Sequence, residues 1–133
     1  MTGRKKGSNS LTPLELQIMQ VLWSEGQSNV LQVQKNLAPN KDLAYNTVQT
    51  MLNILHRKGR VQRTLKGRAY FYRPIASREK FRRQAVLEFV ERLFGGSSEE
   101  LVMSLIKGRQ LDPERIADLS RKLAIQEEGE RDD

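Results

Sequence analysis

The sequence of 133 residues contains no cysteine and only one histidine, His56. Without cysteine, the chain can form no disulfide framework, no thiolate metal site and no cysteine nucleophile. A lone histidine is more often a surface residue or a phosphate contact than a metal ligand, because a metal site needs several ligands. We therefore expect no metal site and no cofactor.

Long apolar runs are also missing. No segment approaches the ~20 apolar residues that cross a bilayer, and the N-terminal MTGRKKGSNS is basic but lacks the apolar stretch of a secretory signal. With so few candidate groups, the chain lacks the convergent acid, base and nucleophile set of an enzyme. The sequence predicts a cytoplasmic protein that is not an enzyme and does not insert into membranes.

Acidic residues are scarce in one part of the chain only. Residues 1–83 hold sixteen Lys or Arg and four Asp or Glu, whereas residues 84–133 hold seven and twelve. The two balances, +12 and −5, account for the net charge of +7. This division indicates that one end binds a polyanion and the other serves a different purpose. A random gradient of solubilising charge is the alternative.

Capping signals and apolar periodicity predict three helices in the basic part. The first begins with Thr12 and Glu15 as a capping box and can end at Gly26. The second is expected to stop before Pro39, and the third covers about residues 44–58. The apolar positions expected to face the core are Leu14, Ile18, Val21, Leu22, Val30, Val33, Leu37, Val48, Met51, Leu52 and Leu55.

Two short strands are expected next. Residues 60–63 alternate in polarity, Lys66 and Gly67 supply a turn, and residues 69–72 are rich in strand-forming aromatics. Alternation turns Phe71 away from the tyrosines on either side, and we expect Phe71 to enter the core. Three helices followed by a basic hairpin is the order of a winged helix-turn-helix.

The outward face of the third helix is polar but uncharged. Asn and Gln side chains can pair with adenine, the Thr methyl group can contact thymine, and no carboxylate would be repelled by phosphate. The predicted base-reading residues are Asn46, Thr47, Gln49, Thr50 and Asn53. Contacts with the DNA backbone, or from the hairpin, are predicted for Lys41, Tyr45, Arg57, Arg63, Lys66 and Arg68. The alternatives are a merely solvated face, or a winged helix that binds RNA, a protein partner, or DNA without sequence preference.

The acidic part predicts three amphipathic helices. Ser77 can cap the first, Gly95 and Gly96 interrupt it, Ser97 and Glu100 form a possible capping box, and Pro113 starts the last. Their apolar faces are too broad for one small chain to cover, so self-association is the simplest remedy. Folding back onto the winged helix is the alternative. The residues assigned to dimerisation are Phe89, Val90, Leu93, Phe94, Leu101, Val102, Leu105, Ile106, Ile116, Leu119 and Leu123.

The predicted fold is mainly helical with a small β-hairpin. The expected segments are a basic flexible arm (1–10), a winged-helix DNA-binding domain (11–75), a helical dimerisation domain (76–126) and a disordered acidic tail (127–133).

Four segments, LTPLELQIMQVLW, AYNTVQTMLNILHRKG, GRAYFYRP and ERLFGGS, give the sequence a resemblance to the penicillinase-repressor (BlaI/MecI) family. The resemblance runs from about Leu11 to Ile125 and implies a dimeric bacterial repressor that binds inverted-repeat operator DNA and blocks transcription. In antibiotic-responsive relatives, a membrane sensor protease leads to cleavage at an Asn-Phe pair in the C-terminal domain. Alignment on FGGS places Ser104 and Leu105 at this position, so the resemblance implies cleavage between these two residues; the alternative is that a sensor protease paired with this protein prefers another bond.

Overall fold

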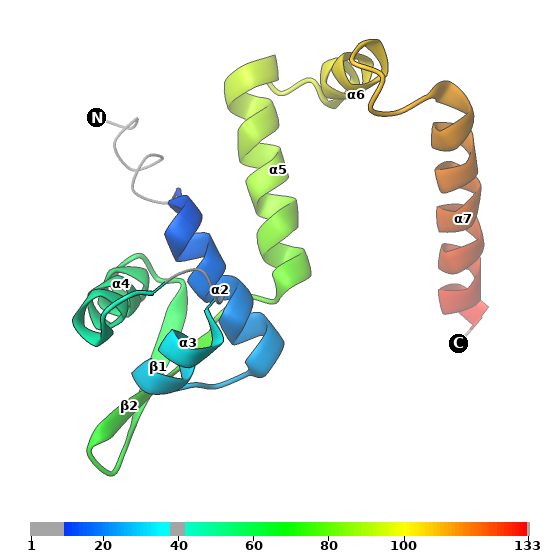
Figure 1. Cartoon of the computed structure of the whole chain (residues 1–133). Helices are drawn as coiled ribbons and strands as arrows, with labels where there is room; N and C mark the ends of the chain where they lie inside the picture. The colour runs from blue at the N-terminus through cyan, green and yellow to red at the C-terminus, as the bar shows by residue number, and fades with distance from the viewer. Residues whose placement is uncertain (1–9, 38–41, 133) are drawn as a thin grey trace. The chain divides into compact units, whose positions relative to one another are not determined.

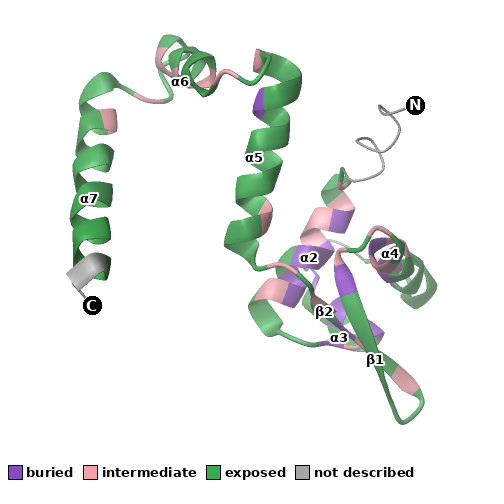
Figure 2. Ribbon diagram, turned by 180° about the vertical axis from the view of Figure 1, so that it is seen from behind, coloured by how far each residue is buried: buried purple, intermediate pink, exposed green. Residues whose placement is uncertain are grey.

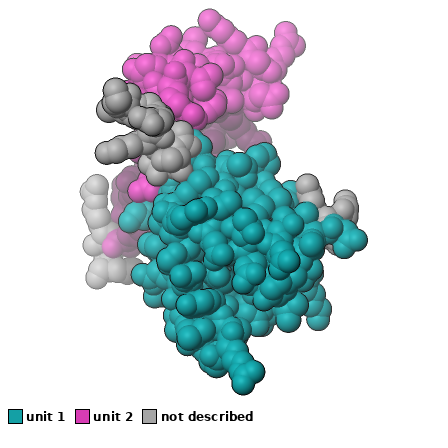
Figure 3. All heavy atoms as spheres, turned by 90° about the vertical axis from the view of Figure 1, so that its left-hand side faces the viewer, with its two compact units in different colours: residues 1–82 teal, residues 83–133 magenta. Residues whose placement is uncertain are grey.

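The computed structural model describes residues 10–37 and 42–132, and the arm of residues 1–9 lies outside the described residues. The order of elements is α2 (Pro13–Glu25), α3 (Val30–Asn36), α4 (Tyr45–Arg57), β1 (Val61–Lys66), β2 (Ala69–Pro74), α5 (Arg78–Phe94), α6 (Ser98–Lys107) and α7 (Pro113–Asp132) (Figure 1). The predicted mainly helical fold with one antiparallel hairpin is confirmed. Two compact units, residues 1–82 and 83–133, divide the chain within α5 (Figure 3).

The ends of the first two helices follow from their capping residues. The Thr12 hydroxyl accepts a hydrogen bond from the Glu15 amide at 3.1 Å, and the Glu15 carboxylate accepts one from the Thr12 amide at 2.9 Å. This is the predicted capping box of α2, and Gly26 ends the helix with φ 83°, a backbone conformation that favours glycine. Helix α3 has a second capping box, formed by Asn29 and Gln32.

The core of the first unit lies where α2, α3, α4 and the hairpin meet (Figure 2). Of the apolar positions predicted to face inward, Leu14 and Met51 are half-buried and the rest are buried. The side chains with no exposed surface include Ile18, Leu22, Val33, Val48, Leu52 and Leu55. Three of these belong to α4, so the core fixes the rotation of that helix and therefore which of its side chains face solvent.

The prediction that Phe71 enters the core is wrong, because Tyr72 occupies that position. Strand register pairs Val61 with Pro74 and Arg63 with Tyr72, so Tyr72 lies on the same face of the hairpin as the buried Val61. Ser28 pairs with the free edge of β2 at Tyr72, with N–H···O distances of 3.0 and 2.8 Å. Phe71 is left half-buried on the opposite face.

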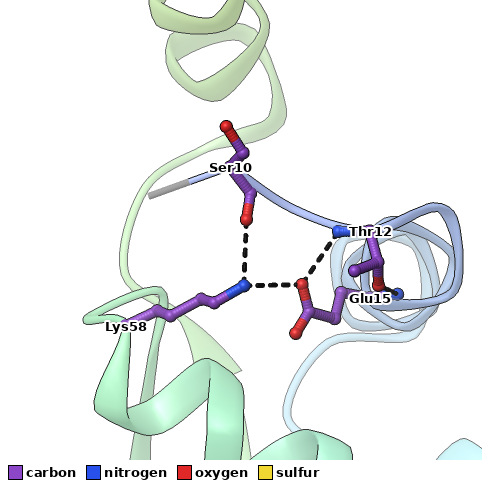
Figure 4. A network of polar contacts seen from close by, with 4 residues as sticks. All are labelled: Ser10, Thr12, Glu15 and Lys58. Atoms are coloured by element: carbon purple, nitrogen blue, oxygen red, sulfur yellow. Dashed lines mark hydrogen bonds and ion pairs between the residues drawn. The ribbon is translucent and has the colours of Figure 1, made fainter. Parts of the chain in front are cut away.

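An ion pair between the half-buried Lys58 and the buried Glu15 ties the C-terminal end of α4 to the N-terminal end of α2 (Figure 4). Lys58 Nζ donates to Glu15 Oε1 at 2.8 Å and to the Ser10 carbonyl at 2.9 Å. Glu15 is only 2% exposed, and burial alone would raise the pKa of its carboxyl group. Hydrogen bonds from Lys58 and Thr12 outweigh burial and hold the pKa of Glu15 below its ordinary value.

The first turn of α5 packs on the first unit. Trp23 Nε1 donates to the Ala76 carbonyl at 3.0 Å, and the Trp23 and Phe81 rings are 5.2 Å apart between centroids. The Ser77 hydroxyl accepts from the Lys80 amide at 3.1 Å, as its predicted capping role requires. These contacts explain why the division of the chain falls after residue 82 and not at the end of β2.

The second unit contains the rest of α5, with α6 and α7. Ser97 caps α6 by accepting from the Glu100 amide at 3.2 Å, and Asp112 accepts from the Arg115 amide at 2.8 Å at the start of α7. Residues 127–132, expected to be disordered, instead continue α7 to Asp132. The reason is that Glu and Arg favour helix, and only Gly129 and the terminal Asp132 disfavour it. Of the helices described, none is at once long and apolar enough to span a bilayer.

Replacing Lys58 by methionine should lower the free energy of unfolding by about 3 kcal/mol at neutral pH, because Glu15 would stay buried without its cation. A carboxyl group whose pKa is lowered by folding stabilises the fold above its unfolded pKa, and that contribution disappears as the pH falls through the folded value. The difference in the free energy of unfolding between wild type and Lys58→Met should therefore become smaller at acidic pH. Urea unfolding at several pH values measures it, with the exposed neighbour Arg57→Met as control; equal losses in both variants would contradict the role of the ion pair.

Candidate functional site

The outward face of α4 is a surface of neutral polar side chains. Val48, Leu52 and Leu55 are fully buried on the opposite side of the helix and hold that face outward. The predicted base-reading residues are all exposed: Asn46, Thr47, Gln49, Thr50 and Asn53. No carboxylate or cation lies between Leu43 and His56, so this face carries hydrogen-bonding groups and methyl groups without net charge.

The N-terminal end of α4 differs from those of α2 and α3, which both have capping boxes. Ala44 is the N-cap residue, no side chain among the described residues caps the helix, and the first turn contains no acid. Free N–H groups and the helix dipole make such an end favourable for a negative charge. Tyr45 is exposed at this end, whereas Lys41 lies outside the described residues.

The hairpin carries cations on both faces. The Arg63 guanidinium lies 4.4 Å from the centroid of the Tyr70 ring, and Lys66 Nζ lies 5.3 Å from that of Phe71 on the other face. Lys66 also donates to Gln27 Oε1 at 3.1 Å. Arg68 is the second residue of the two-residue turn that begins with Gly67 at φ 65°, and it is exposed. Neighbouring rings hold Arg63 and Lys66 along the hairpin, and neither of them forms an ion pair with a described residue.

Positive charge is concentrated beside the neutral face. Arg57, in the last turn of α4, is exposed and forms no ion pair with a described residue. The next residue, Lys58, is directed inward to Glu15 and is therefore unavailable to a ligand. Four acids are present in residues 1–83, and one of them, Glu15, is neutralised by this pair. The first unit therefore attracts anions.

A contact between α4 and the hairpin was not predicted. Asn53 Oδ1 accepts hydrogen bonds from the Tyr72 hydroxyl at 3.3 Å and from the Arg63 guanidinium at 3.4 Å. Periodicity placed Asn53 on the outward face but could not show that the hairpin reaches it. The part of the chain that the structure describes contains no group of three or more His, Asp or Glu side chains able to hold a metal.

The second unit exposes large apolar side chains. Of the residues assigned to dimerisation, Val90 is buried, and Leu93 (62% exposed) and Leu123 (59%) are the most exposed. Phe89, Leu105 and Leu119 are also exposed, whereas the half-buried ones are Phe94, Leu101, Val102, Ile106 and Ile116. Exposed apolar side chains in this number are unusual on a small unit. Ser104 and Leu105 are both exposed and lie inside α6.

Comparisons with known proteins find one matching family and several similar proteins. Residues 11–125 match the family model described as penicillinase repressor. The penicillinase repressor of Bacillus licheniformis is 28% identical over 82% of this chain and 85% of its own length, and the transcriptional regulator BlaI of Mycobacterium tuberculosis is 31% identical over 71% and 82%. A solution structure of monomeric Bacillus licheniformis BlaI in complex with the blaP half-operator is 30% identical, covering 53% of this chain and 85% of that one, with a TM-score of 0.45.

Replacing Ala44 by serine should raise the free energy of unfolding by about 1 kcal/mol, because the hydroxyl would cap an N–H group of α4. Thr12→Ala, which removes the existing cap of α2, should lower it by a similar amount. Both are measured by urea denaturation. An unchanged stability in Ala44→Ser would mean that the end of α4 is already satisfied.

Proposed function

Because the chain belongs to the penicillinase repressor family, we propose that it is a transcriptional repressor that binds double-stranded operator DNA through α4 and the hairpin. The observation that carries the proposal is the neutral polar face of α4 between an uncapped N-terminal end and a basic hairpin. Base edges require neutral donors and acceptors, and phosphates require cations. The first unit supplies both on adjoining elements.

In the proposed complex, α4 lies in the major groove. Gln49 is the best candidate for specificity, because its carboxamide can donate to and accept from an adenine edge, and no described side chain competes for it. The free N–H groups of α4 and Tyr45 contact phosphate at the groove edge. Arg57, Lys66 and Arg68 neutralise the backbone on either side.

We propose that the second unit joins two copies. One recognition helix reads only a few base pairs, whereas two helices related by a twofold axis read an inverted repeat. The exposed apolar side chains of α5, α6 and α7 would be buried between the copies. A dimer bound to its operator would then block polymerase sterically.

Relief by proteolysis at Ser104–Leu105 is supported only by the position of that bond in the alignment. The bond lies inside α6 (Ser98–Lys107), and helical bonds are cut slowly because proteolysis favours exposed loops. If a membrane sensor protease leads to cleavage here, α6 must first unfold locally. The two flanking side chains are exposed, so little packing opposes that unfolding.

RNA binding is disfavoured by the aromatic side chains of β2. Recognition of unpaired RNA commonly uses neighbouring exposed rings on which bases stack. Here Tyr72 is buried, Lys66 lies against Phe71, and Tyr70 is covered on one side by Arg63. The hairpin therefore offers cations in place of a stacking platform.

Gln49→Ala should weaken binding to the selected operator by about 1–3 kcal/mol per half-site and relax the preference at one base pair. Lys66→Ala should weaken binding to all duplexes alike and reduce the slope of log K against log salt by about 1. The measurement is selection from a random duplex pool, followed by titrations at several salt concentrations. If both variants lost the same affinity for specific and for random DNA, the protein would be a non-specific DNA binder.

Leu93→Glu and Leu123→Glu should each convert a dimer into a monomer, since a leucine buried at an interface contributes about 1.5–3 kcal/mol and a carboxylate there opposes association. Leu31→Glu is the matched control, because Leu31 is as exposed (61%) but lies on α3 in the first unit. Sedimentation equilibrium gives the oligomeric state. Dimers that persist in both Glu variants would place the interface elsewhere.

A further inference from the structure

Asn53 differs from the other outward polar residues of α4 in that it contacts the hairpin. Its Oδ1 atom accepts from the Tyr72 hydroxyl and the Arg63 guanidinium, which both belong to the hairpin. The remaining predicted base-reading residues, Asn46, Thr47, Gln49 and Thr50, have no hydrogen bond to the hairpin among the described residues. Asn53 is therefore the place where the helix face and the hairpin are joined by side chains.

The direction of the Asn53 carboxamide follows from the chemistry of its partners. A guanidinium has donors and no acceptor, so the oxygen of Asn53 must face Arg63 and the NH₂ group must point away. Tyr72 makes this arrangement rigid, because the residue is only 1% exposed and its backbone N–H and C=O are both hydrogen-bonded to Ser28. The hydroxyl therefore approaches Asn53 from a fixed position in the core.

Arg63 is held at two points. Its guanidinium lies over Tyr70 at 4.4 Å and donates to Asn53 at 3.4 Å. An arginine side chain that is free in solution loses rotamer entropy when it binds a phosphate. The Arg63 side chain is already ordered by these two contacts, and its positive charge lies next to the base-reading face of α4.

We propose, on the basis of the DNA-binding function inferred above, that Asn53 is a positioning residue that couples the hairpin to α4 and does not read a base bidentately. A bidentate contact with adenine needs both the oxygen and the NH₂ group of the carboxamide. Turning the oxygen toward a base would break both hairpin contacts and leave the buried Tyr72 hydroxyl unpaired. Asn53 instead keeps Arg63 at a fixed distance from Gln49 and so sets which phosphate the hairpin grips when α4 is in register.

The test is a double-mutant cycle with Asn53→Ala and Tyr72→Phe, titrated against the selected operator and against each of its single base-pair variants. Tyr72→Phe removes one oxygen and keeps the buried ring, and its circular dichroism and melting curve control for folding. Each single variant should lower operator affinity by about three- to tenfold, and the double variant no further than Asn53→Ala alone, because Asn53→Ala already removes the contact that Tyr72→Phe breaks. The base-pair preferences should stay those of wild type, whereas Gln49→Ala should relax one of them.

Arg63→Ala gives a readout that a purely structural role would not change. It should weaken operator binding less in the Asn53→Ala background than in wild type, because Arg63 is already released there. Relaxed preference at one base pair in Asn53→Ala, or effects of Asn53→Ala and Tyr72→Phe that multiply, would overturn the positioning role alone. A wild-type protein without any sequence preference would instead overturn the proposed function and this inference with it.

Discussion

The arrangement of the first unit depends on the Glu15 carboxylate. It closes the capping box of α2 and, from the same position, accepts a hydrogen bond from Lys58 at the end of α4. A surface made only of neutral polar groups cannot fix its own orientation, because each group is satisfied equally well by water. The direction of the α4 face is therefore set from inside, by this ion pair at one end and by apolar packing along the helix.

The cations of the first unit serve different purposes, although they look equivalent in the sequence. Lys58 is structural, Arg63 and Lys66 lie on aromatic rings, and Arg57 and Arg68 are exposed. Net charge alone would assign all of them to an anionic ligand. The division follows from burial. A cation whose partner is a buried carboxylate is not available to a ligand, whereas a cation that lies on an aromatic ring keeps its charge available to a phosphate.

Features that depend on neighbours in the sequence were predictable, and features that depend on distant segments were not. Thr12, Glu15 and Gly26 fixed the limits of α2 because caps act within four residues. The choice of Tyr72 over Phe71 as the buried ring required the pairing of β2 with Ser28, which is far away in sequence. The Asn53 contacts with the hairpin could not be predicted either, because they also join separate elements. Residues 127–132 are helical where disorder was expected, because charge alone does not reveal the helix propensity of Glu and Arg.

The uneven charge of the chain makes ionic strength act in opposite senses on the two proposed associations. Added salt screens the attraction of the basic part, +12 over residues 1–83, for a polyanion and so weakens the complex. The acidic parts, −5 in each copy, repel one another when two chains meet, and salt relieves that repulsion. The proposed dimers would therefore form more readily in the conditions in which each of them would hold DNA less tightly. Occupancy of an operator at fixed protein concentration should thus pass through a maximum at intermediate salt.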